Sequence, residues 1–448
     1  ANVDITPEFA VKLGAAYGST LPLGADIVFS RDQRNVSRMV ARSLIAGLMS
    51  VGINIQNLEC TAIPISRTMA SRLDVVGGIH VRVHPDRPDS ILIEFFNGVG
   101  INISKDMEKK IEGAYFKEDF RRVLIEQIGD MAYPAQAFDV YSNSFEKHLN
   151  IETIRNSNSK IVIDYVYAVS GAVLPILLAK FDCDAVVLNA SLKQTAVSNV
   201  MREELLIQLG QVVEALHGSM GAQVSANGEQ LILVDESGFS IRGETLTAVM
   251  VSCMLKAQPR GTIVVPVHTS SAVDHIVRRH DGKIIRTKAN PTALMEACQD
   301  NENVILGGSG DMGFIFPDLH PGFDAMFTIA KLVEMLTIHE QSLAQVRSNI
   351  PDVYYRSHSM RCPWAVKGAL MRYLVEHHPT ENLELVDGVK IVTHHNDDWI
   401  LILPDAGESL VHIYVNSDRK EWVDRTMKEY RQRVQNFIDL EQGVTETF

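Results

Sequence analysis

Short apolar strands and amphipathic helices alternate along most of this 448-residue chain, and this order limits the fold more than any other feature. A strand-like run at 25–29 is followed by apolar residues at helical spacing over 36–48, and the alternation continues to about residue 140. The same order restarts at 160–188 and again at 262–336. Strands that alternate with helices are typical of a parallel or mixed sheet covered by helices. The sequence therefore predicts three successive α/β units, the third with a helix from Phe323 to Leu336.

The last hundred residues follow a different pattern. Two strand-like runs, 399–403 and 410–415, surround a turn and are followed by a helix with apolar residues at helical spacing: Val423, Met427, Tyr430, Val434 and Phe437. This order predicts a small α+β domain. Because the chain is too long for one hydrophobic core, we predict four domains, at 1–150, 151–255, 256–350 and 351–448.

Charge and hydropathy exclude several classes of function. The formal net charge of -13 repels phosphodiester backbones, so we expect no nucleic acid partner. No apolar run is long enough to cross a membrane and no signal peptide is visible, so we expect a cytoplasmic protein. The five cysteines contain no CxxC pair, which favours buried, reduced thiols over disulfides or a zinc site: Cys60, Cys183, Cys253, Cys298 and Cys362.

The segment Gly308–Gly313 matches the GxGxxG pattern of dinucleotide-binding loops. That pattern needs a strand before it and a helix directly after it, so that the pyrophosphate meets helix amides. A strand-like run at 303–306 does precede it, whereas Phe314–Pro317 does not begin a helix. The segment is therefore either a dinucleotide loop or a glycine-rich turn that leaves a strand.

His80, Arg82 and His84 alternate within 78–85. In a strand, these three side chains point to one face. They are consistent with a polar strand face at a surface or interface, with an anion site, or with a metal site. The metal interpretation lacks a carboxylate at ligand spacing.

The segment Arg31–Arg34 follows a strand and precedes a helix, which is where α/β folds place ligand-binding groups. In the alternative interpretation, Asp32 caps the turn and pairs with an arginine. The group His394, His395, Asp397 and Asp398 suggests either a metal site or a solvated loop, and neighbouring residues in a turn rarely converge on one ion.

The order of segments resembles the α-D-phosphohexomutase superfamily, which includes phosphomannomutase and phosphoglucomutase, across essentially the whole chain. The segments that resemble family motifs are Ile5–Glu8 with Lys12–Gly14 for the first helix, Arg31–Arg34 for GRDxR, Gly77–Ile79 before the catalytic loop, Leu231–Gly238 after the metal loop, and Asp387–Ile391 with Trp399–Leu403 in the last domain. The resemblance implies an α/β fold with three phosphohexomutase-type α/β/α domains plus a small C-terminal α+β domain around a central cleft.

Two functional loops of the family are altered in this chain. The catalytic loop, usually TASHNPPEYNGIKFF, aligns without gaps with Arg82–Phe96, which places His84 at the phosphoserine position and Pro85 at the histidine that follows. The metal loop DGDGDR becomes Ser225–Gln230, in which Ser225, Asn227 and Glu229 stand at the aspartate positions. A hard cation needs several carboxylate oxygens, so we expect no metal cofactor, although the family would use Mg2+.

The other two loops have also lost their family residues. The family's sugar loop GEESGH aligns with Gly308–Gly313, which lacks the glutamates and the histidine. The family's phosphate loop RPSGTEP aligns with Leu403–Ser409, which lacks the arginine and contains Asp405 in addition. Phosphoryl transfer depends on charge placed around the moving group. Four altered loops therefore predict that this chain is not an active phosphohexomutase.

Such an altered module resembles the C-terminal half of long mannose-1-phosphate guanylyltransferase-like proteins, in which a nucleotidyltransferase domain precedes a phosphomannomutase-like region. The start at Ala1 suits a chain cut from a longer protein. The resemblance implies a non-catalytic module of a nucleotide-sugar protein, with a structural, oligomerising or sugar-phosphate-sensing role. Its implied partners are a sugar phosphate or nucleotide sugar, a fused or associated nucleotidyltransferase domain, and a second copy in a homo-oligomer. The alternative is an active hexose-phosphate mutase that uses His84 as an atypical nucleophile.

We expect ligand-binding groups at the first-domain edge of the cleft, because the other walls have lost the family's polar residues. The candidates are Arg31, Arg34, Arg82 and His84. Arg82 can form a forked pair with a phosphate, and His84 would add charge below its reference pKa of about 6.5. In an acidic chain, such binding should be weak and sensitive to salt.

Overall fold

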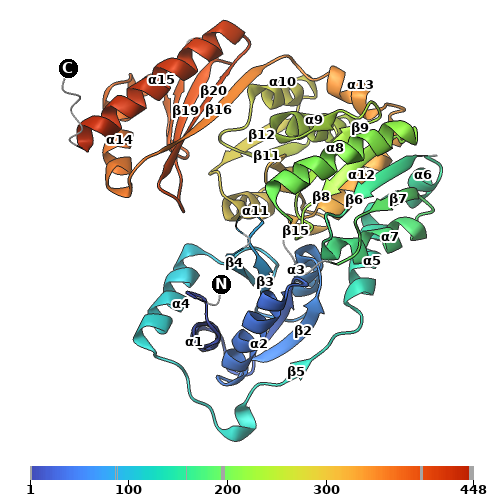
Figure 1. Ribbon diagram of the computed structural model, residues 1–448, viewed down its shortest axis with the longest axis vertical. Helices are drawn as coiled ribbons and strands as arrows, with labels where there is room; N and C mark the ends of the chain where they lie inside the picture. The colour runs from blue at the N-terminus through green and yellow to red at the C-terminus, as the bar shows by residue number, and fades with distance from the viewer. Residues whose placement is uncertain are drawn as a thin grey trace.

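The computed structural model describes residues 3–85, 87, 89–157, 159–192, 197–393 and 397–442. Within these ranges, four five-stranded sheets follow one another along the chain (Figure 1). Their strands fall at 26–132, 160–241, 262–323 and 354–417, and the first to fourth domains are named after these sheets. The predicted fold of three α/β units and one small α+β unit is confirmed. The domain limits at 150, 255 and 350 stay predictions.

The first sheet has the strand order β4-β3-β1-β2-β5, with β4 antiparallel to β3 and the other neighbouring pairs parallel. Its strands are β1 Asp26–Arg31, β2 Asn54–Cys60, β3 Gly77–Val83, β4 Ile91–Asn97 and β5 Met131–Ala132. The helices are α1 Pro7–Thr20, α2 Asn35–Met49, α3 Ile63–Arg72, α4 Lys105–Lys117 and the short 3-10 helix Ile125–Gln127. Pro7 opens α1, and the Thr6 side chain caps it by accepting a hydrogen bond from the Phe9 amide at 3.3 Å.

Alternation along β1 decides which helices cover which face of this sheet. Ile27 and Phe29 pack in a core with residues of α1, α2 and α4. Val28 points the other way, into a core that contains residues of α3 and the helix α5 (Ala137–His148). The domain therefore has three layers, α/β/α, and the loops at the carboxyl ends of its parallel strands open on one edge.

The second sheet has the order β10-β9-β8-β6-β7, in which β6, β7 and β8 run parallel. Its strands are β6 Lys160–Asp164, β7 Asp184–Leu188, β8 Met220–Val224, β9 Leu231–Asp235 and β10 Ser240–Ile241. Besides α5, its helices are α6 Ile151–Arg155, the 3-10 helix Val169–Ala172, α7 Leu174–Lys180 and α8 Asn199–Ala215. The apolar run Ile161–Ile163 is fully buried, which is typical of a central strand covered on both faces.

The third sheet has the order β12-β11-β13-β14-β15. Its strands are β11 Thr262–Pro266, β12 Lys283–Thr287, β13 Val304–Ser309, β14 Gly313–Phe316 and β15 His320–Phe323. Its helices are α9 Gly243–Ala257, α10 Ser271–Arg279, α11 Pro291–Asp300, α12 Ala325–Ile338 and α13 Leu343–Ser348. The predicted helical start at Phe323 is wrong, because Phe323 ends β15 and the Asp324 side chain caps α12 by accepting the Phe327 amide at 2.9 Å.

The GxGxxG segment forms a hairpin between β13 and β14. These strands pair antiparallel, with Ser309 opposite Gly313 and Gly308 opposite Phe314. No helix follows the glycines, since the chain turns directly into β14. The dinucleotide interpretation is therefore wrong, and the glycine-rich turn is confirmed.

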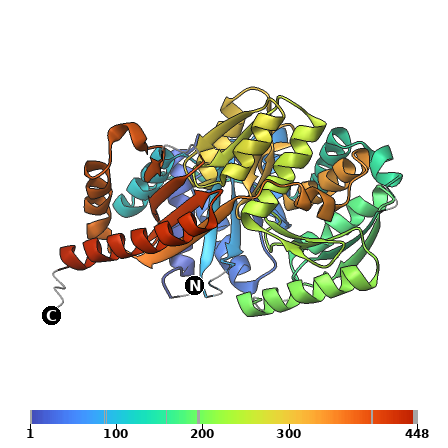
Figure 2. The ribbon, with the colours of Figure 1, turned by 90° about the horizontal axis from the view of Figure 1, so that it is seen from above.

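The fourth sheet is antiparallel throughout, with the order β16-β20-β19-β18-β17. Its strands are β16 Tyr354–Arg361, β17 Leu383–Glu384, β18 Val389–Val392, β19 Trp399–Pro404 and β20 Leu410–Ser417. The helices α14 Trp364–Glu376 and α15 Lys420–Glu441, with the 3-10 helix Thr380–Asn382, belong to this domain. Both α-helices pack on one face of the sheet, and Figure 2 shows α15 lying across it. Trp399 on the opposite face packs against Val267 of the third domain.

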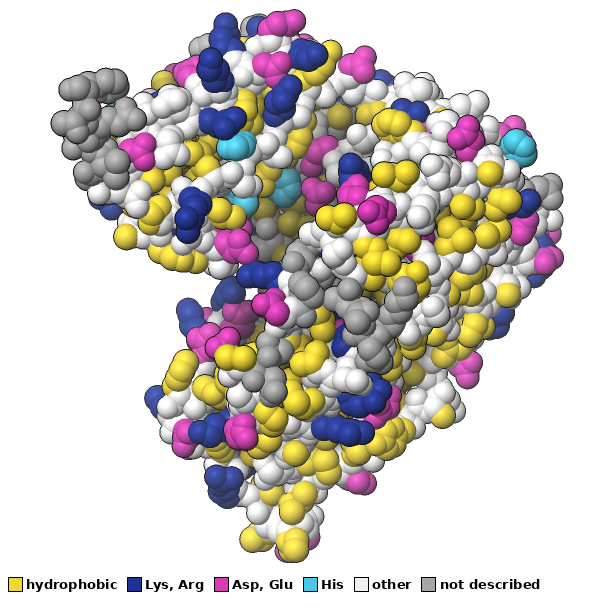
Figure 3. All heavy atoms as spheres, in the orientation of Figure 1, with side chains coloured by type: hydrophobic (Ala, Val, Ile, Leu, Met, Phe, Trp, Pro, Cys, Tyr) yellow, Lys and Arg dark blue, Asp and Glu magenta, His cyan; other side chains and the backbone are white. Residues whose placement is uncertain are grey.

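A single buried core joins the first three domains, because it contains Ile65 of α3, Ile163 of β6 and Phe327 of α12. The fourth domain has a core of its own, and Figure 3 shows the surface hollowed between this domain, at the upper left, and the first domain below. Acidic and histidine side chains lie on the wall of this hollow. Among the described residues, no helix combines the length and the apolar character needed to span a membrane.

Candidate functional site

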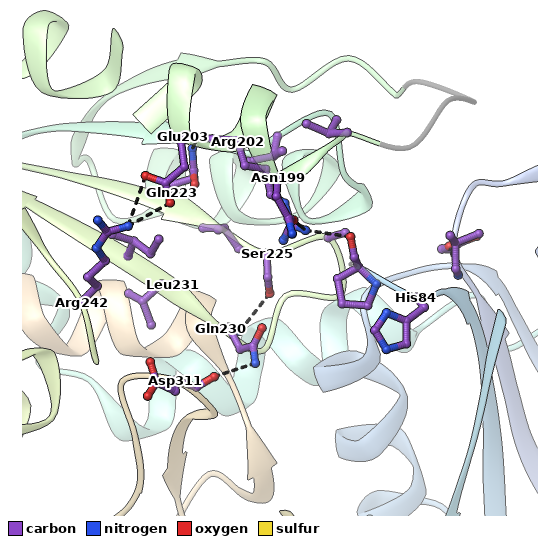
Figure 4. Close-up of a pocket in the computed structure, with 18 of the residues that line it drawn as sticks. His84, Asn199, Arg202, Glu203, Gln223, Ser225, Gln230, Leu231, Arg242 and Asp311 are labelled. Atoms are coloured by element: carbon purple, nitrogen blue, oxygen red, sulfur yellow. Dashed lines mark hydrogen bonds and ion pairs between the residues drawn. The ribbon is translucent and has the colours of Figure 1, made fainter. Parts of the chain in front are cut away.

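A cavity of about 400 Å³ lies where loops of the first three domains meet. From the first domain, residues 32–34 after β1 and 83–85 at the end of β3 line the cavity. From the second domain, the hairpin between β8 and β9 contributes 223–226 and 230–232. From the third domain, the turn between β13 and β14 contributes 310–311. The start of α8, Val166, Val197 and Arg242 complete the lining. Several of these loops leave the carboxyl ends of parallel strands, which is where α/β folds bind ligands (Figure 4).

His84 lies on the first-domain side of this cavity (Figure 4). Its amide donates to the Ser90 carbonyl at 2.9 Å, and its Nδ1 atom accepts a hydrogen bond from the Arg87 amide at 3.2 Å. The next residue, Pro85, accepts a hydrogen bond through its carbonyl from Nη2 of Arg202 in α8, at 2.7 Å. The loop at the family's phosphoserine position is thus tied to the second domain.

Arg34 also lines the cavity, and one nitrogen of its guanidinium has no hydrogen-bond partner among the described residues. The residue is 8% exposed, and among the described residues its Nη1 atom has no hydrogen-bond partner. Burial lowers the pKa of Arg34, and the nearby Asp32 opposes this shift. The Asp32 carboxylate accepts the Arg34 amide at 2.8 Å and the Val83 amide at 2.9 Å, so it holds the turn through backbone groups, as its capping interpretation required.

Arg31 and Arg82 lie outside this cavity. Arg31 pairs with Glu59, with Nη2 2.5 Å from Oε2, and lines a separate hollow of about 310 Å³ beside α2. Arg82 forms a forked ion pair with Glu94, with Nε 2.5 Å from Oε2 and Nη2 3.3 Å from Oε1. Burial acts to raise the pKa of Glu94, yet Arg82 holds it at about 2. The assignment of these two arginines to ligand binding stays a prediction, with both guanidinium groups paired to carboxylates.

His80 takes part in a buried hydroxyl network. Its Nδ1 atom lies 2.7 Å from Oγ of Ser30, which in turn accepts a hydrogen bond from Oγ of Ser66 at 2.6 Å. The residue is 1% exposed, and burial lowers its pKa to about 3. His80 is therefore buried within the domain, and the anion site suggested by the three alternating residues stays a prediction.

The loop Ser225–Gln230 is a tight turn between β8 and β9, closed by a hydrogen bond from the Ser225 amide to the Gln230 carbonyl at 2.9 Å. Its three candidate metal ligands bond to one another. Oγ of Ser225 donates to Oδ1 of Asn227 at 2.7 Å, and Nδ2 of Asn227 donates to Oε2 of Glu229 at 2.6 Å. Their oxygen atoms are thus partly used within the turn.

Arg67 of α3 supplies the positive charge beside this loop, and the sequence analysis did not find it. Its Nε atom lies 3.4 Å from Oε1 of Glu229, and the two side chains are 1% and 9% exposed. Its other nitrogens donate to the Gly100 carbonyl at 2.7 Å and to Oδ1 of Asn102 at 2.8 Å. Burial raises the pKa of Glu229 to about 7, against the opposing effect of Arg67. A lone arginine in an amphipathic helix gives no sequence signal of such a role.

The segment 403–409, which aligns with the family's phosphate loop, is held by hydrogen bonds to a carboxylate of the same segment. Oδ1 of Asp405 accepts the amides of Gly407 and Glu408, both at 2.7 Å, and Oδ2 accepts Nε2 of His412 at 3.0 Å. From the first domain, Nη2 of Arg87 lies 3.1 Å from Oε1 of Glu408. The two loops therefore meet across the hollow through a surface ion pair.

His394 and His395 lie outside the described residues. Asp397 lies 3.2 Å from Nη2 of Arg278, and Asp398 accepts a hydrogen bond from Oγ of Ser417 at 2.5 Å. Over the described ranges, no group of three or more His, Cys, Asp and Glu side chains is arranged to hold a metal ion.

Sheet order, loop positions and cavity define a multidomain α/β protein with a small-molecule cavity where loops of three domains meet. Three family models for phosphoglucomutase/phosphomannomutase match consecutive segments: α/β/α domain I at residues 1–122, domain II at 139–238 and domain III at 242–354. The chain belongs to this family.

Sequence relatives extend the match to nearly the full length. The chain is 26% identical over 432 residues to phosphoglucomutase/phosphomannomutase of Thermococcus kodakarensis, covering 94% of this chain and 93% of that protein. It is 24% identical to phosphoglucosamine mutase of Methanocaldococcus jannaschii, with 95% of each chain covered.

Solved structures show the same fold. A phosphoglucomutase/phosphomannomutase family protein of Burkholderia thailandensis superimposes with a TM-score of 0.84 at 17% identity, covering 97% of this chain and 95% of that chain. N-acetylphosphoglucosamine mutase of Aspergillus fumigatus, in complex with GlcNAc-6P and magnesium, gives a TM-score of 0.54 at 10% identity, covering 93% of this chain and 83% of that chain.

The loop 225–230 does not fit the magnesium ion that the family implies. It offers Glu229 as its one carboxylate, and that group has a pKa raised to about 7. A divalent ion beside Glu229 would also stand next to the guanidinium of Arg67. Mg2+ prefers several hard oxygen ligands and keeps its waters, so the residues present in this loop are a poor match for the ion.

Proposed function

We propose that this chain is a non-catalytic phosphohexomutase-family protein that binds a phosphorylated hexose in the cavity between its first three domains. The observation that carries the proposal is the buried contact between Arg67 and Glu229, in which Nε and Oε1 lie 3.4 Å apart without a hydrogen bond. It places a protein cation where the family would need a divalent ion, and a guanidinium fixed by Gly100 and Asn102 cannot follow a moving phosphoryl group.

Two further contacts support the loss of turnover. His84 stands at the phosphoserine position, and its Nδ1 atom accepts the Arg87 amide. Asp405 places a carboxylate on the amides of the loop that receives phosphate in the family. Each contact removes a group that phosphoryl transfer would use.

The biological setting stays a proposal that rests on the resemblance alone. In that setting the module has a structural, oligomerising or sugar-phosphate-sensing role beside a nucleotidyltransferase. Ligand binding without turnover is what a sensing role requires.

The second candidate is an active hexose-phosphate mutase, and the comparisons favour it. The relatives carry the names of mutases, and the chain covers at least nine-tenths of their length. In this chain, the phosphoryl group would have to pass through a ring nitrogen of His84, because that residue occupies the nucleophile position.

The test is a mutase assay with mannose, glucose and glucosamine phosphates, a bisphosphate activator and Mg2+, together with calorimetric titration of the same ligands. We expect binding without turnover. Turnover at the rate of ordinary family members that disappears in His84→Ala would establish the second candidate instead. Turnover that survives in His84→Ala would come from a contaminating enzyme.

A further inference from the structure

We infer that Arg34 is the anion receptor of this protein, and that it holds the phosphate group of the ligand at the seam between the first and second domains. The inference rests on the proposed function and gives the bound group a place and a chemical class. That class is a phosphate monoester on a small polyhydroxylated molecule.

The guanidinium of Arg34 is buried without full compensation. The residue is 8% exposed, and in the part of the chain that the structure describes its Nη1 atom makes no hydrogen bond. A buried charged donor without a partner is costly, and an anion in the adjoining cavity removes that cost with charge-assisted bonds. The 15-residue helix α2 begins at the next residue without a side-chain cap, which adds the positive end of its dipole.

Each acidic residue of the cavity has a partner other than the Arg34 guanidinium, although the charge of Asp32 favours the charged form of Arg34. The Asp32 carboxylate accepts the backbone amides of Arg34 and Val83. Glu203 in α8 pairs with Arg242, with Oε1 2.9 Å from Nη1. Asp311 belongs to the third-domain rim, well away from His84 in Figure 4.

A second cation is held at the same seam. Arg202 in α8 donates from Nη2 to the Pro85 carbonyl at 2.7 Å, and its own carbonyl accepts Nε2 of Gln223 at 3.1 Å. These contacts fix the Arg202 guanidinium over the loop that carries His84 (Figure 4). The cavity of about 400 Å³ between them is in the size range of small-molecule sites.

In the fourth-domain loop at 403–409, backbone amides already donate hydrogen bonds to a carboxylate of the same loop. Its amides at Gly407 and Glu408 bind the Asp405 carboxylate, and Lys367 donates to the Asp405 carbonyl at 2.6 Å. A phosphate at this loop would meet the negative charge of Asp405. The phosphate is therefore expected at the opposite wall of the cleft, on Arg34.

The experiment is calorimetric titration of inorganic phosphate, mannose 1-phosphate and uncharged mannose into wild type, Arg34→Met and Arg31→Met. Arg31 is a matched control, since it has the same 8% exposure in the same turn but pairs with Glu59 and lines a different hollow. We expect Arg34→Met to weaken both phosphate ligands by about tenfold to a hundredfold, the loss of charge-assisted hydrogen bonds, with Arg31→Met close to wild type. Any binding of mannose should be the same in all three proteins.

The outcomes separate this inference from the proposed function. If Arg34→Met binds the phosphate ligands as tightly as Arg31→Met, the inference is wrong and the proposed function stands. If wild type binds inorganic phosphate through Arg34 but no hexose phosphate, the anion site stands and the proposed ligand does not. If wild type binds neither, both are wrong. Arg34→Lys keeps the positive charge but cannot form two parallel hydrogen bonds, so we expect it to bind the phosphate ligands with intermediate affinity. It replaces Arg34→Met if that variant does not fold.

Discussion

The Nε atom of Arg67 lies 3.4 Å from Oε1 of Glu229, so an ion pair joins helix α3 of the first domain to the β8–β9 turn of the second. The third domain approaches the same side chain, because a Cβ atom built on Gly322 would lie only 2.6 Å from Cδ of Arg67. The ring of Phe96 lies 5.5 Å from the guanidinium carbon. One buried arginine therefore stands where three domains meet.

The first prediction is that divalent ions leave this protein unchanged. Because the one carboxylate of the turn is paired with Arg67, adding MgCl2 or EDTA at millimolar concentration should leave the melting temperature the same. Calorimetry with magnesium should give the same result for wild type and Glu229→Gln. A heat of binding in wild type that is absent from Glu229→Gln would contradict the prediction.

The second prediction concerns the energetic coupling of Arg67 and Glu229. Arg67→Met should lower the free energy of unfolding by about 3–5 kcal/mol, because it leaves a buried carboxyl group without its charged partner. The double variant Arg67→Met with Glu229→Met should recover much of this loss, since apolar residues can replace a buried ion pair at little cost. Urea denaturation of the four proteins measures the coupling, and additive losses would show that the pair is not coupled.

The third prediction is a pH dependence from His80. Burial lowers its pKa to about 3, whereas the unfolded chain takes up a proton near pH 6.5. The free energy of unfolding should therefore fall as the pH drops from about 6.5 towards 3, with up to about 1.4 kcal/mol per pH unit from this residue. In urea denaturation between about pH 7.5 and about pH 4.5, His80→Gln should show a shallower fall than wild type. Equal slopes would assign the effect to other groups.

The fourth prediction concerns Asp405. Burial acts to raise its pKa, but the bonds from His412 and from two amides lower it, so the charged carboxylate stabilises the loop above its unfolded pKa. Asp405→Ala should lower the free energy of unfolding by about 1–2 kcal/mol at neutral pH. The affinity for mannose 1-phosphate should stay the same, because Arg34 lies elsewhere. A large gain in affinity would show instead that Asp405 blocks a second anion site.

The local features of the fold were predictable from the sequence. The strand-like runs predicted at 399–403 and 410–415 are found as β19 and β20. The final helix is also found, as α15. Periodicity and capping are properties of neighbouring residues, so one chain segment is enough to reveal them. The altered loops are visible in the same way, because each occupies a short segment.

Partners that come from distant segments were decided by the tertiary structure alone. Arg31 and Arg34 lie in one turn, yet Arg31 pairs with Glu59, whereas Arg34 lines the cavity and has a buried nitrogen without a partner among the described residues. Arg67 meets Glu229 only because α3 packs against the turn between β8 and β9. The sequence by itself determined the order of three α/β units and one small α+β unit. The structure decided which charges meet, because a side chain's partner and its desolvation depend on how remote elements pack around it.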